Sequence, residues 1–153
     1  MALDSFTTLA LVRDAAGFTG NTDVTDATIT LDVDAANAQL ISALQSRYVL
    51  PLNEDSYYSG SPAEDWLSKL ATNLAVANLY LREFVGTSDS LDYRMTDLFR
   101  ISNKEVAKLQ SGEMNLVGSD SNILPVKDSG LKAANGYPDN TADAPEFSMS
   151  DTF

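Results

Sequence analysis

Apolar residues recur three or four positions apart in four stretches of the chain, which is the spacing of a helix with one buried face. The first stretch follows Ser5 and Thr7, either of which can cap a helix, and it ends near Gly17. Phe18 is then placed to pack back on this helix. The pattern therefore predicts a short first helix that starts after Ser5 or Thr7 and ends near Gly17.

The second stretch predicts a long helix that begins at Thr25 and Asp26. An aspartate is favoured at this position because the N-terminal end of a helix carries partial positive charge. Pro51 stops the helix, since proline cannot continue it. The apolar stripe consists of Ile29, Val33, Ala36, Leu40, Ile41, Leu44 and Tyr48.

The third helix has the strongest start signal in the chain. Ser61 is a capping residue, Pro62 occupies the first helical position, and Glu64 follows three residues after the cap. The second half of this helix is apolar on nearly all sides, so neighbours must cover it. Those neighbours belong either to the same chain or to another subunit. The extra residues to be covered are Ala75, Val76, Leu79 and Tyr80.

A Thr-Ser-Asp-Ser stretch at 87–90 can cap the last helix, which ends at Gly112. Four helices account for the body, so we predict a mainly α fold with a small four-helix body over residues 1–112. The loop at 53–60 carries Tyr57 and Tyr58, which either form a binding tip or pack on the domain. The inner stripe of the last helix consists of Leu91, Met95, Leu98, Phe99, Val106 and Leu109.

Residues 113–153 have a different composition. These 41 positions contain only eleven large apolar residues, too few to offset the entropy of ordering the segment by itself. We therefore predict a long extended C-terminal arm that docks on a surface outside it. In an extended strand, Phe147, Met149 and Phe153 share one face, which suits insertion against a sheet edge or groove. The predicted docking residues are Ile123, Leu124, Pro125, Val126, Pro145, Phe147, Met149 and Phe153.

Composition excludes several classes of function. The 22 acidic and 10 basic side chains give a net charge of −12, which disfavours tight binding to nucleic-acid phosphates. The chain has no histidine and no cysteine, so the commonest general base, metal ligand and thiol nucleophile are missing. We expect no enzyme, no cofactor and no metal. No apolar run is long enough to span a bilayer, and we expect a soluble chain without a signal peptide.

One short motif opens an alternative function. Ser90 lies in an Asp-Ser-Leu sequence at 89–91 that resembles the attachment site of acyl carrier proteins, in which the serine carries phosphopantetheine. The residues that follow argue against this reading, because basic side chains at Arg94 and Arg100 stand where carrier proteins present acids. Helix capping explains the same stretch.

A basic stripe runs along the last helix at Arg100, Lys104 and Lys108. Such a row is either solvated or, if copies of the chain lie side by side, faces Asp26 and Asp34 of the neighbouring copy. In the second case the charges would orient the contact more than they would strengthen it.

The end of the second helix and the start of the third carry a family resemblance. The stretch Arg47-Tyr48-Val49-Leu50-Pro51-Leu52, followed by a loop and a helix from Pro62 to Tyr80, resembles the head-tail adaptor (head completion or connector) proteins of tailed bacteriophages, in particular the Mu-like group. The resemblance covers roughly residues 5–112. The long acidic arm at 113–153 is a departure from the pattern.

The resemblance implies a structural virion subunit that assembles with copies of itself into a ring, usually a dodecamer, under the portal protein. Such a ring extends the DNA exit channel and receives a stopper or tail protein, here through Tyr57 and Tyr58. The C-terminal segment engages the portal, and double-stranded DNA passes without specific binding because the acidic wall repels it. The expected location is the virion neck, and the host cytoplasm during assembly, with no membrane contact. A non-viral helical interaction module is the other alternative.

Overall fold

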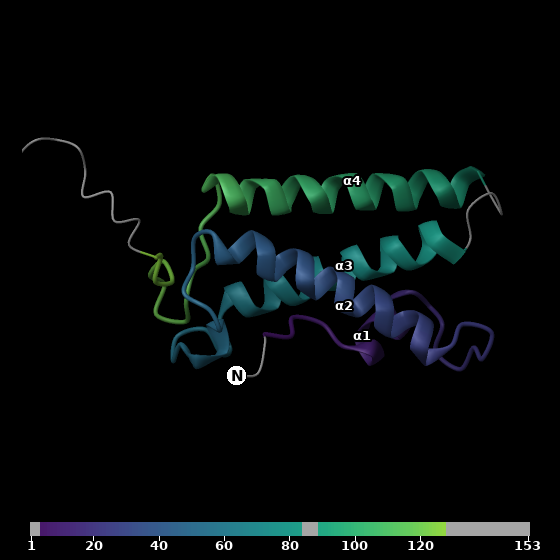
Figure 1. The fold of residues 1–153 in the computed structure, drawn as a ribbon, viewed down its shortest axis with the longest axis horizontal. Coiled ribbons are helices and arrows are strands. Elements are labelled where there is room, and N and C mark those ends of the chain that lie inside the picture. Colours follow the sequence, from purple (N-terminus) through teal and green to yellow (C-terminus); the bar gives the residue numbers. More distant parts are fainter. Residues whose placement is uncertain (1–3, 84–88, 128–153) are drawn as a thin grey trace, which may run out of the picture.

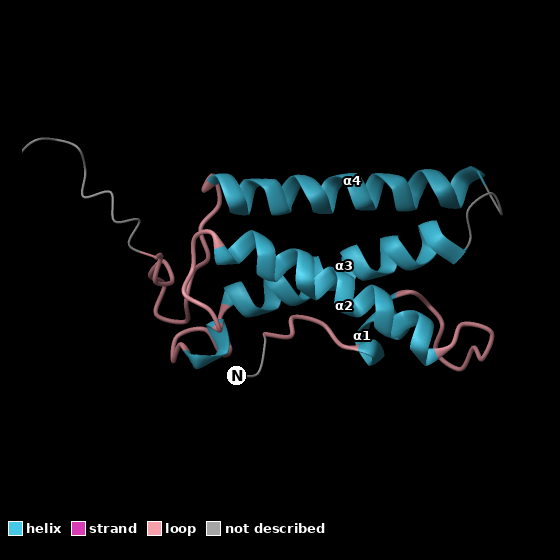
Figure 2. Ribbon diagram, viewed as in Figure 1, coloured by secondary structure: helices cyan, strands magenta, loops and turns pink. Residues whose placement is uncertain are grey.

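The computed structural model describes residues 4–83 and 89–127. The fold is mainly helical, as the sequence predicts, and no strand forms in this part of the chain (Figure 2). Two isolated antiparallel bridges join Tyr48 to Val126 and Val117 to Ile123. The helices are α1 (Leu9–Ala15), α2 (Asp26–Gln45), α3 (Pro62–Glu83) and α4 (Asp89–Ser111), with a short 3-10 helix, η1 (Leu52–Glu54), between α2 and α3.

The three long helices pack side by side. α3 lies against both α2 and α4, and α2 also touches α4 (Figure 1). The short α1 packs on α2 and α3, on the side of the molecule away from α4. α2 and α4 run in the same direction and α3 runs in the opposite one. Buried residues from all four helices form one hydrophobic core.

Local start signals form as predicted at two helices. The Thr25 hydroxyl accepts a hydrogen bond from Thr28 N (3.3 Å), and the Ser61 hydroxyl accepts one from Glu64 N (3.2 Å). The Glu64 carboxylate reaches back to Gly60 N (2.6 Å), which satisfies a second donor at the helix start. Gly112, with φ of +83°, follows the last residue of α4. This left-handed conformation suits glycine and ends the helix.

The first helix begins later than the sequence suggested. Thr8, rather than Ser5 or Thr7, caps α1 by accepting from Leu11 N (3.4 Å). Thr7 is instead buried, and its hydroxyl lies 2.7 Å from that of Thr72 on α3. A tertiary contact that local sequence does not encode therefore takes one candidate cap and shifts the helix start.

The apolar second half of α3 is covered by the same chain. Ala75, Val76 and Leu79 are buried among the chain's own helices. The Tyr80 hydroxyl donates to Ala16 O (2.8 Å), and the Tyr80 ring lies 5.4 Å from that of Phe18. The chain itself thus buries Ala75, Val76 and Leu79 and partly covers Tyr80.

One ion pair links the first half of α2 to the C-terminal end of α3. Arg82 donates to the carboxylate of Asp32 (2.8 Å) and to Thr28 O (3.0 Å). The Asp32 side chain is almost completely buried, whereas that of Arg82 is partly exposed. Burial raises the pKa of Asp32, Arg82 lowers it, and the neighbouring Glu83 raises it further. The arginine thus compensates a carboxylate that would be costly to bury alone.

Replacing Arg82 with glutamine is expected to lower the free energy of unfolding by about 1–2 kcal/mol at neutral pH, because Asp32 loses its cation. The loss should shrink in acid, since protonation removes the charge that Arg82 compensates. The pKa of Asp32 is higher in the folded chain than its ordinary value of 3.8, so the folded chain binds this proton more readily than the unfolded chain does. The contribution of Asp32 to stability is therefore full below pH 3.8 and falls as pH rises through the raised pKa. Urea denaturation at several pH values measures both effects.

The matched control is Arg100→Gln, which removes an exposed arginine that pairs with Asp97 on the same helix. This change is expected to leave stability unaltered at every pH, because solvent screens such a pair. An Arg82→Gln loss that stayed constant from neutral to acid pH would contradict the role assigned to Asp32.

Candidate interaction surface

The candidate site lies at the end of the bundle where α2 ends, α3 begins and α4 ends (Figure 1). Residues 113–127 return over this end after α4, although they belong to the predicted arm. Arg47 fixes both ends of this segment. Its guanidinium donates to Met114 O (3.1 Å) and to the Asn115 side chain (2.9 Å), and its own carbonyl accepts from Lys127 N (2.6 Å).

Tyr48 extends the hydrophobic core into the same segment. Its side chain is completely buried, and its hydroxyl accepts from Leu116 N (3.0 Å). Leu116 and Leu124 are each only 2 % exposed and belong to the core, and Leu124 N donates to Leu116 O (2.9 Å). Buried backbone donors must find partners, so the tyrosine hydroxyl stabilises this path of the chain.

A tight turn closes the loop between Val117 and Ile123. Ser121 has φ of +66°, and Asp120 accepts from Asn122 N (3.0 Å) and from the Asn122 side chain (2.9 Å). Both hydrogen bonds lower the pKa of Asp120, and the bond from the Asn122 side chain has the larger effect. The loop is also tied to the body, because Ser119 N donates to Tyr57 O (2.8 Å).

This packing leaves a cluster of apolar side chains exposed to solvent. Five of the nine exposed large hydrophobic residues among those described lie here, with exposed fractions between 36 and 56 %. The two β-bridges and the Ser119–Tyr57 hydrogen bond bring together the chain segments that carry these five residues. Exposed apolar side chains gathered at one end of a domain mark an interaction site more often than single scattered ones do. We call it the end surface; it consists of Val49, Tyr57, Val117, Ile123 and Val126.

A cleft of about 250 Å³ opens beside Val49 and continues the end surface. It lies between the 49–52 segment and Pro125, with Glu54 and Asp55 at its edge. Asp4 supports this segment from inside, since its buried carboxylate accepts from Leu52 N (2.8 Å) and Asn53 N (3.3 Å). The stretch that carries the family resemblance, 47–52, therefore forms one wall of the site.

The predicted docking residues divide into three groups. Ile123, Pro125 and Val126 are exposed at or beside the end surface. Leu124 is in the core, because its side chain packs inward between two outward neighbours. The remaining docking residues, Pro145, Phe147, Met149 and Phe153, lie outside the described part of the chain.

The two loop tyrosines have different positions. Tyr57 is exposed, whereas Tyr58 is 6 % exposed and packs in the core, where burial raises the pKa of its hydroxyl. Sequence reasoning also missed Val49 and Val117. Val49 stands between the buried Tyr48 and the half-buried Leu50 in the extended segment after α2, so a period of two rather than 3.6 was the signal that could have found it.

The basic stripe on α4 is only partly exposed. Arg100 pairs with Asp97 of its own helix (2.5 Å), Lys104 is exposed, and Lys108 is half-buried. The three residues therefore do not form a uniform cationic row. Of the three, Lys104 alone is both exposed and without an ion pair within the described residues.

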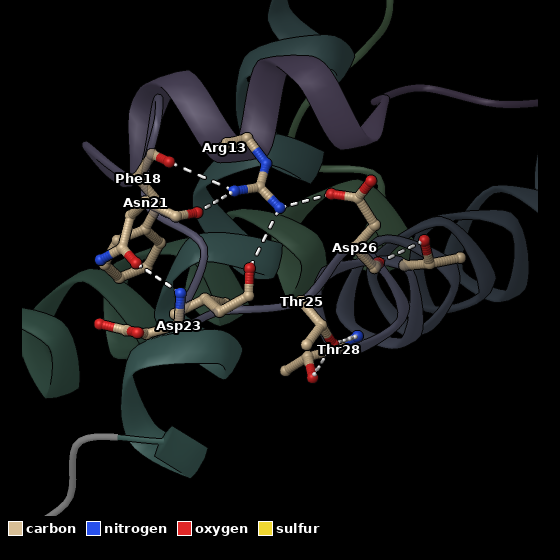
Figure 3. A network of polar contacts seen from close by, with 9 residues as sticks. Arg13, Phe18, Asn21, Asp23, Thr25, Asp26 and Thr28 are labelled. Atoms are coloured by element: carbon tan, nitrogen blue, oxygen red, sulfur yellow. Dashed lines mark hydrogen bonds and ion pairs between the residues drawn. The ribbon is translucent and has the colours of Figure 1, made fainter.

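The predicted acidic partners also differ from one another. Asp26 forms an ion pair with Arg13 of the same chain (Figure 3). Arg13 further donates to Asn21 O (2.8 Å) and Val24 O (3.1 Å), and so holds the loop between α1 and α2. Asp34 is exposed on α2. Asp26 thus has a structural partner already, and Asp34 remains the better candidate for a contact between copies.

The described residues contain neither a metal-binding cluster nor a membrane-spanning helix. No group of three histidine, cysteine, aspartate or glutamate side chains in 4–83 and 89–127 could hold a metal ion. Among the helices described, none is long and apolar enough to cross a bilayer. Ser90 is the second residue of α4, and its side chain lies outside the described part.

Comparison with protein-family models, curated proteins and solved structures found no match to this chain. The end surface and its neighbouring cleft are therefore characterised by their own geometry: an apolar cluster at one end of an acidic helical bundle, next to the point where the chain continues beyond Lys127.

Proposed function

We propose that this chain is a head-tail adaptor subunit of a tailed phage virion. It forms a ring under the portal protein, extends the DNA exit channel and links the head to the stopper or tail. The observation that carries the proposal is the end surface, since an apolar cluster of this kind suits a protein partner. The stretch that resembles the adaptor family forms part of the same surface.

The position of Lys127 supports portal docking at this end. The chain leaves the body there, directly after Val126 of the end surface, and Lys127 donates from its side chain to Gln45 O (2.7 Å) at the end of α2. The chain that leads to the predicted docking residues at 145–153 therefore departs from an anchored residue next to the end surface. One partner, the portal, can contact both the end surface and the arm.

The charge of the chain supports the channel role. Each copy carries −12, so a ring multiplies this negative charge around its lumen. A wall of this sign repels DNA phosphates and lets the duplex pass without binding. A protein that gripped DNA would instead need clustered cations to release counterions.

Electron microscopy of the full chain mixed with portal assemblies of the phage that encodes it tests the proposal. We expect a ring of additional density below the portal, coaxial with its channel. The adaptor role would be abandoned if saturating chain left the portals unchanged. A phosphopantetheine adduct on Ser90 in the intact mass of cell-expressed protein would favour the carrier alternative instead.

Charged substitutions on the end surface provide a sharper test. Val49→Asp and Val126→Asp are each expected to weaken portal binding at least about ten-fold, because burying a valine contributes about 1.5 kcal/mol and a buried unpaired charge opposes binding. Both residues are exposed in the chain alone, so the melting temperature should not change. Co-sedimentation with portal assemblies and thermal denaturation measure the two quantities.

Leu11→Asp is the control, since Leu11 is similarly exposed but lies on α1, away from the end surface (Figure 1). It should bind portals as the unmodified chain does. Equal binding by all three variants would show that the end surface takes no part in docking.

A further inference from the structure

A second apolar depression lies between α3 and α4. This α3–α4 groove has a volume of about 150 Å³, enough for a benzene-sized group. Ile101 is 43 % exposed at its edge, and the half-buried Trp66 forms part of its wall. The lining residues are Trp66, Lys69, Leu70, Asn73, Leu98, Ile101, Ser102 and Glu105.

α2 carries a matching projection on its outer face. Leu31 is 62 % exposed, the highest value among the large aliphatic side chains described. The exposed positions one turn to either side are small, Ala27 and Ala35, so another helix can approach closely around the leucine. Asp34 lies three residues after Leu31 on the same exposed face.

The groove and the projection lie on opposite sides of the bundle. α2 packs against both α3 and α4, and Gln39 donates to Asn103 (2.7 Å) on the α2 side of α4. No residue of α2 lines the α3–α4 groove, which opens on the other side of the α3–α4 pair. Copies placed side by side can therefore insert Leu31 of one into the groove of the next.

Charge gives this contact a direction. α2 contains three aspartates and no basic residue. Two of the three are paired within the chain, Asp26 with Arg13 and Asp32 with Arg82, which leaves Asp34. Around the groove, Lys69 lies on the α3 wall and Lys104 follows Ile101 by three residues, with Glu105 as the acid in the lining. Opposite charge on the two faces steers orientation and register.

We propose that α2 of one copy packs on the α3–α4 groove of the next, with Leu31 between Trp66 and Ile101 and with Asp34 facing Lys104. Leu31 and Asp34 are three residues apart on α2, and Ile101 and Lys104 are three residues apart on α4. The two helices run in the same direction (Figure 1). In this contact Leu31 meets Ile101 and Asp34 meets Lys104 in the same order along both helices. This contact is head-to-tail, which generates a ring when the rotation closes. The inference deepens the proposed adaptor function, since a ring requires such a contact.

Engineered disulfides test the contact, and the absence of native cysteine removes background. The full chain with Leu31→Cys and Ile101→Cys together is expected to form a ladder of linked multimers on mild oxidation, since a disulfide needs Cα atoms about 4.4–6.8 Å apart. Neither single variant should form a ladder, and mixing the two should give only mixed dimers. The matched control pairs Leu11→Cys with Ile101→Cys and should give none.

Charge reversal tests the register. In the two-cysteine background, Lys104→Glu is expected to lower the multimer yield about five-fold, and adding Asp34→Lys should restore most of it. A loss without restoration would overturn the assigned pairing. The contact itself is overturned if no ladder forms, both with the chain at its highest soluble concentration and on portal assemblies, or if the Leu11→Cys pair cross-links equally.

The outcome is separable from that of the proposed function. Portal binding of the unmodified chain is scored by co-sedimentation in the same samples. Binding without a ladder would remove this interface and leave the adaptor role intact. A ladder formed by the chain alone, without portal binding, would support the interface and count against the adaptor role.

Discussion

Replacing Leu124 with alanine is expected to lower the free energy of unfolding by about 2–5 kcal/mol, the range for large-to-small substitutions in a packed core. Leu124 is 2 % exposed and belongs to the core, even though it lies beyond the last helix in a polar segment. Its loss would leave a cavity next to Leu116 and Tyr48, which the turn at 118–122 is too constrained to fill. Urea denaturation of the full chain measures the change.

Ile123→Ala is the matched control, because Ile123 precedes Leu124 directly but is half exposed at the end surface. Its cost should stay below about 1 kcal/mol, as for most surface substitutions. If the two variants lost the same amount, residues 113–127 would not be part of the folded body, and the end surface would lose its support.

The helices were predictable because their signals are local. Ser61, Pro62 and Glu64 specify the start of α3 within four residues, and the hydrogen bonds of Ser61 and Glu64 form there. Thr25 and Asp26 specify the start of α2 in the same way. The apolar spacing then determines which face is buried, and the buried residues of α2 and α3 follow it.

The end surface was not predictable from the same rules. Tyr48 continues the helical spacing of α2, yet the helix ends at Gln45 and Tyr48 pairs with Val126 in an isolated bridge. Its hydroxyl partner, Leu116 N, is 68 positions away in the chain. Periodicity carries no information about such a contact. The sequence therefore predicted only an extended arm for the segment after Gly112. Two of its sparse apolar residues, Leu116 and Leu124, complete the core instead.

The charged residues show the same limit. The sequence places Asp26 and Asp34 in one acidic region, but only the fold brings Arg13 of α1 to Asp26 (Figure 3). The spacing of Arg100, Lys104 and Lys108 likewise gives no sign that Asp97 engages the first of them. A charge pattern identifies a candidate contact between copies, and the pairs within the chain then decide which of its members remain available.

Truncation after Lys127 is expected to abolish recruitment to portal assemblies while leaving the melting temperature unchanged. The cut removes the predicted docking residues at 145–153 but retains Leu116, Leu124 and the hydrogen bond from Lys127 N to Arg47 O. Binding that depends on the arm is thereby separated from folding. Co-sedimentation with portals and thermal denaturation of the same samples give both readings.

Truncation after Gly112, the end of the predicted body, provides the contrast. It removes Leu116 and Leu124 from the core and leaves the Tyr48 hydroxyl without its backbone donor, so both stability and docking should fall. If the chain cut after Lys127 still bound portals and Val49→Asp in that shorter chain then abolished binding, the end surface alone would dock. If neither change reduced binding, portal recruitment would have to involve another face of the bundle, and the adaptor proposal would lose the observation that carries it.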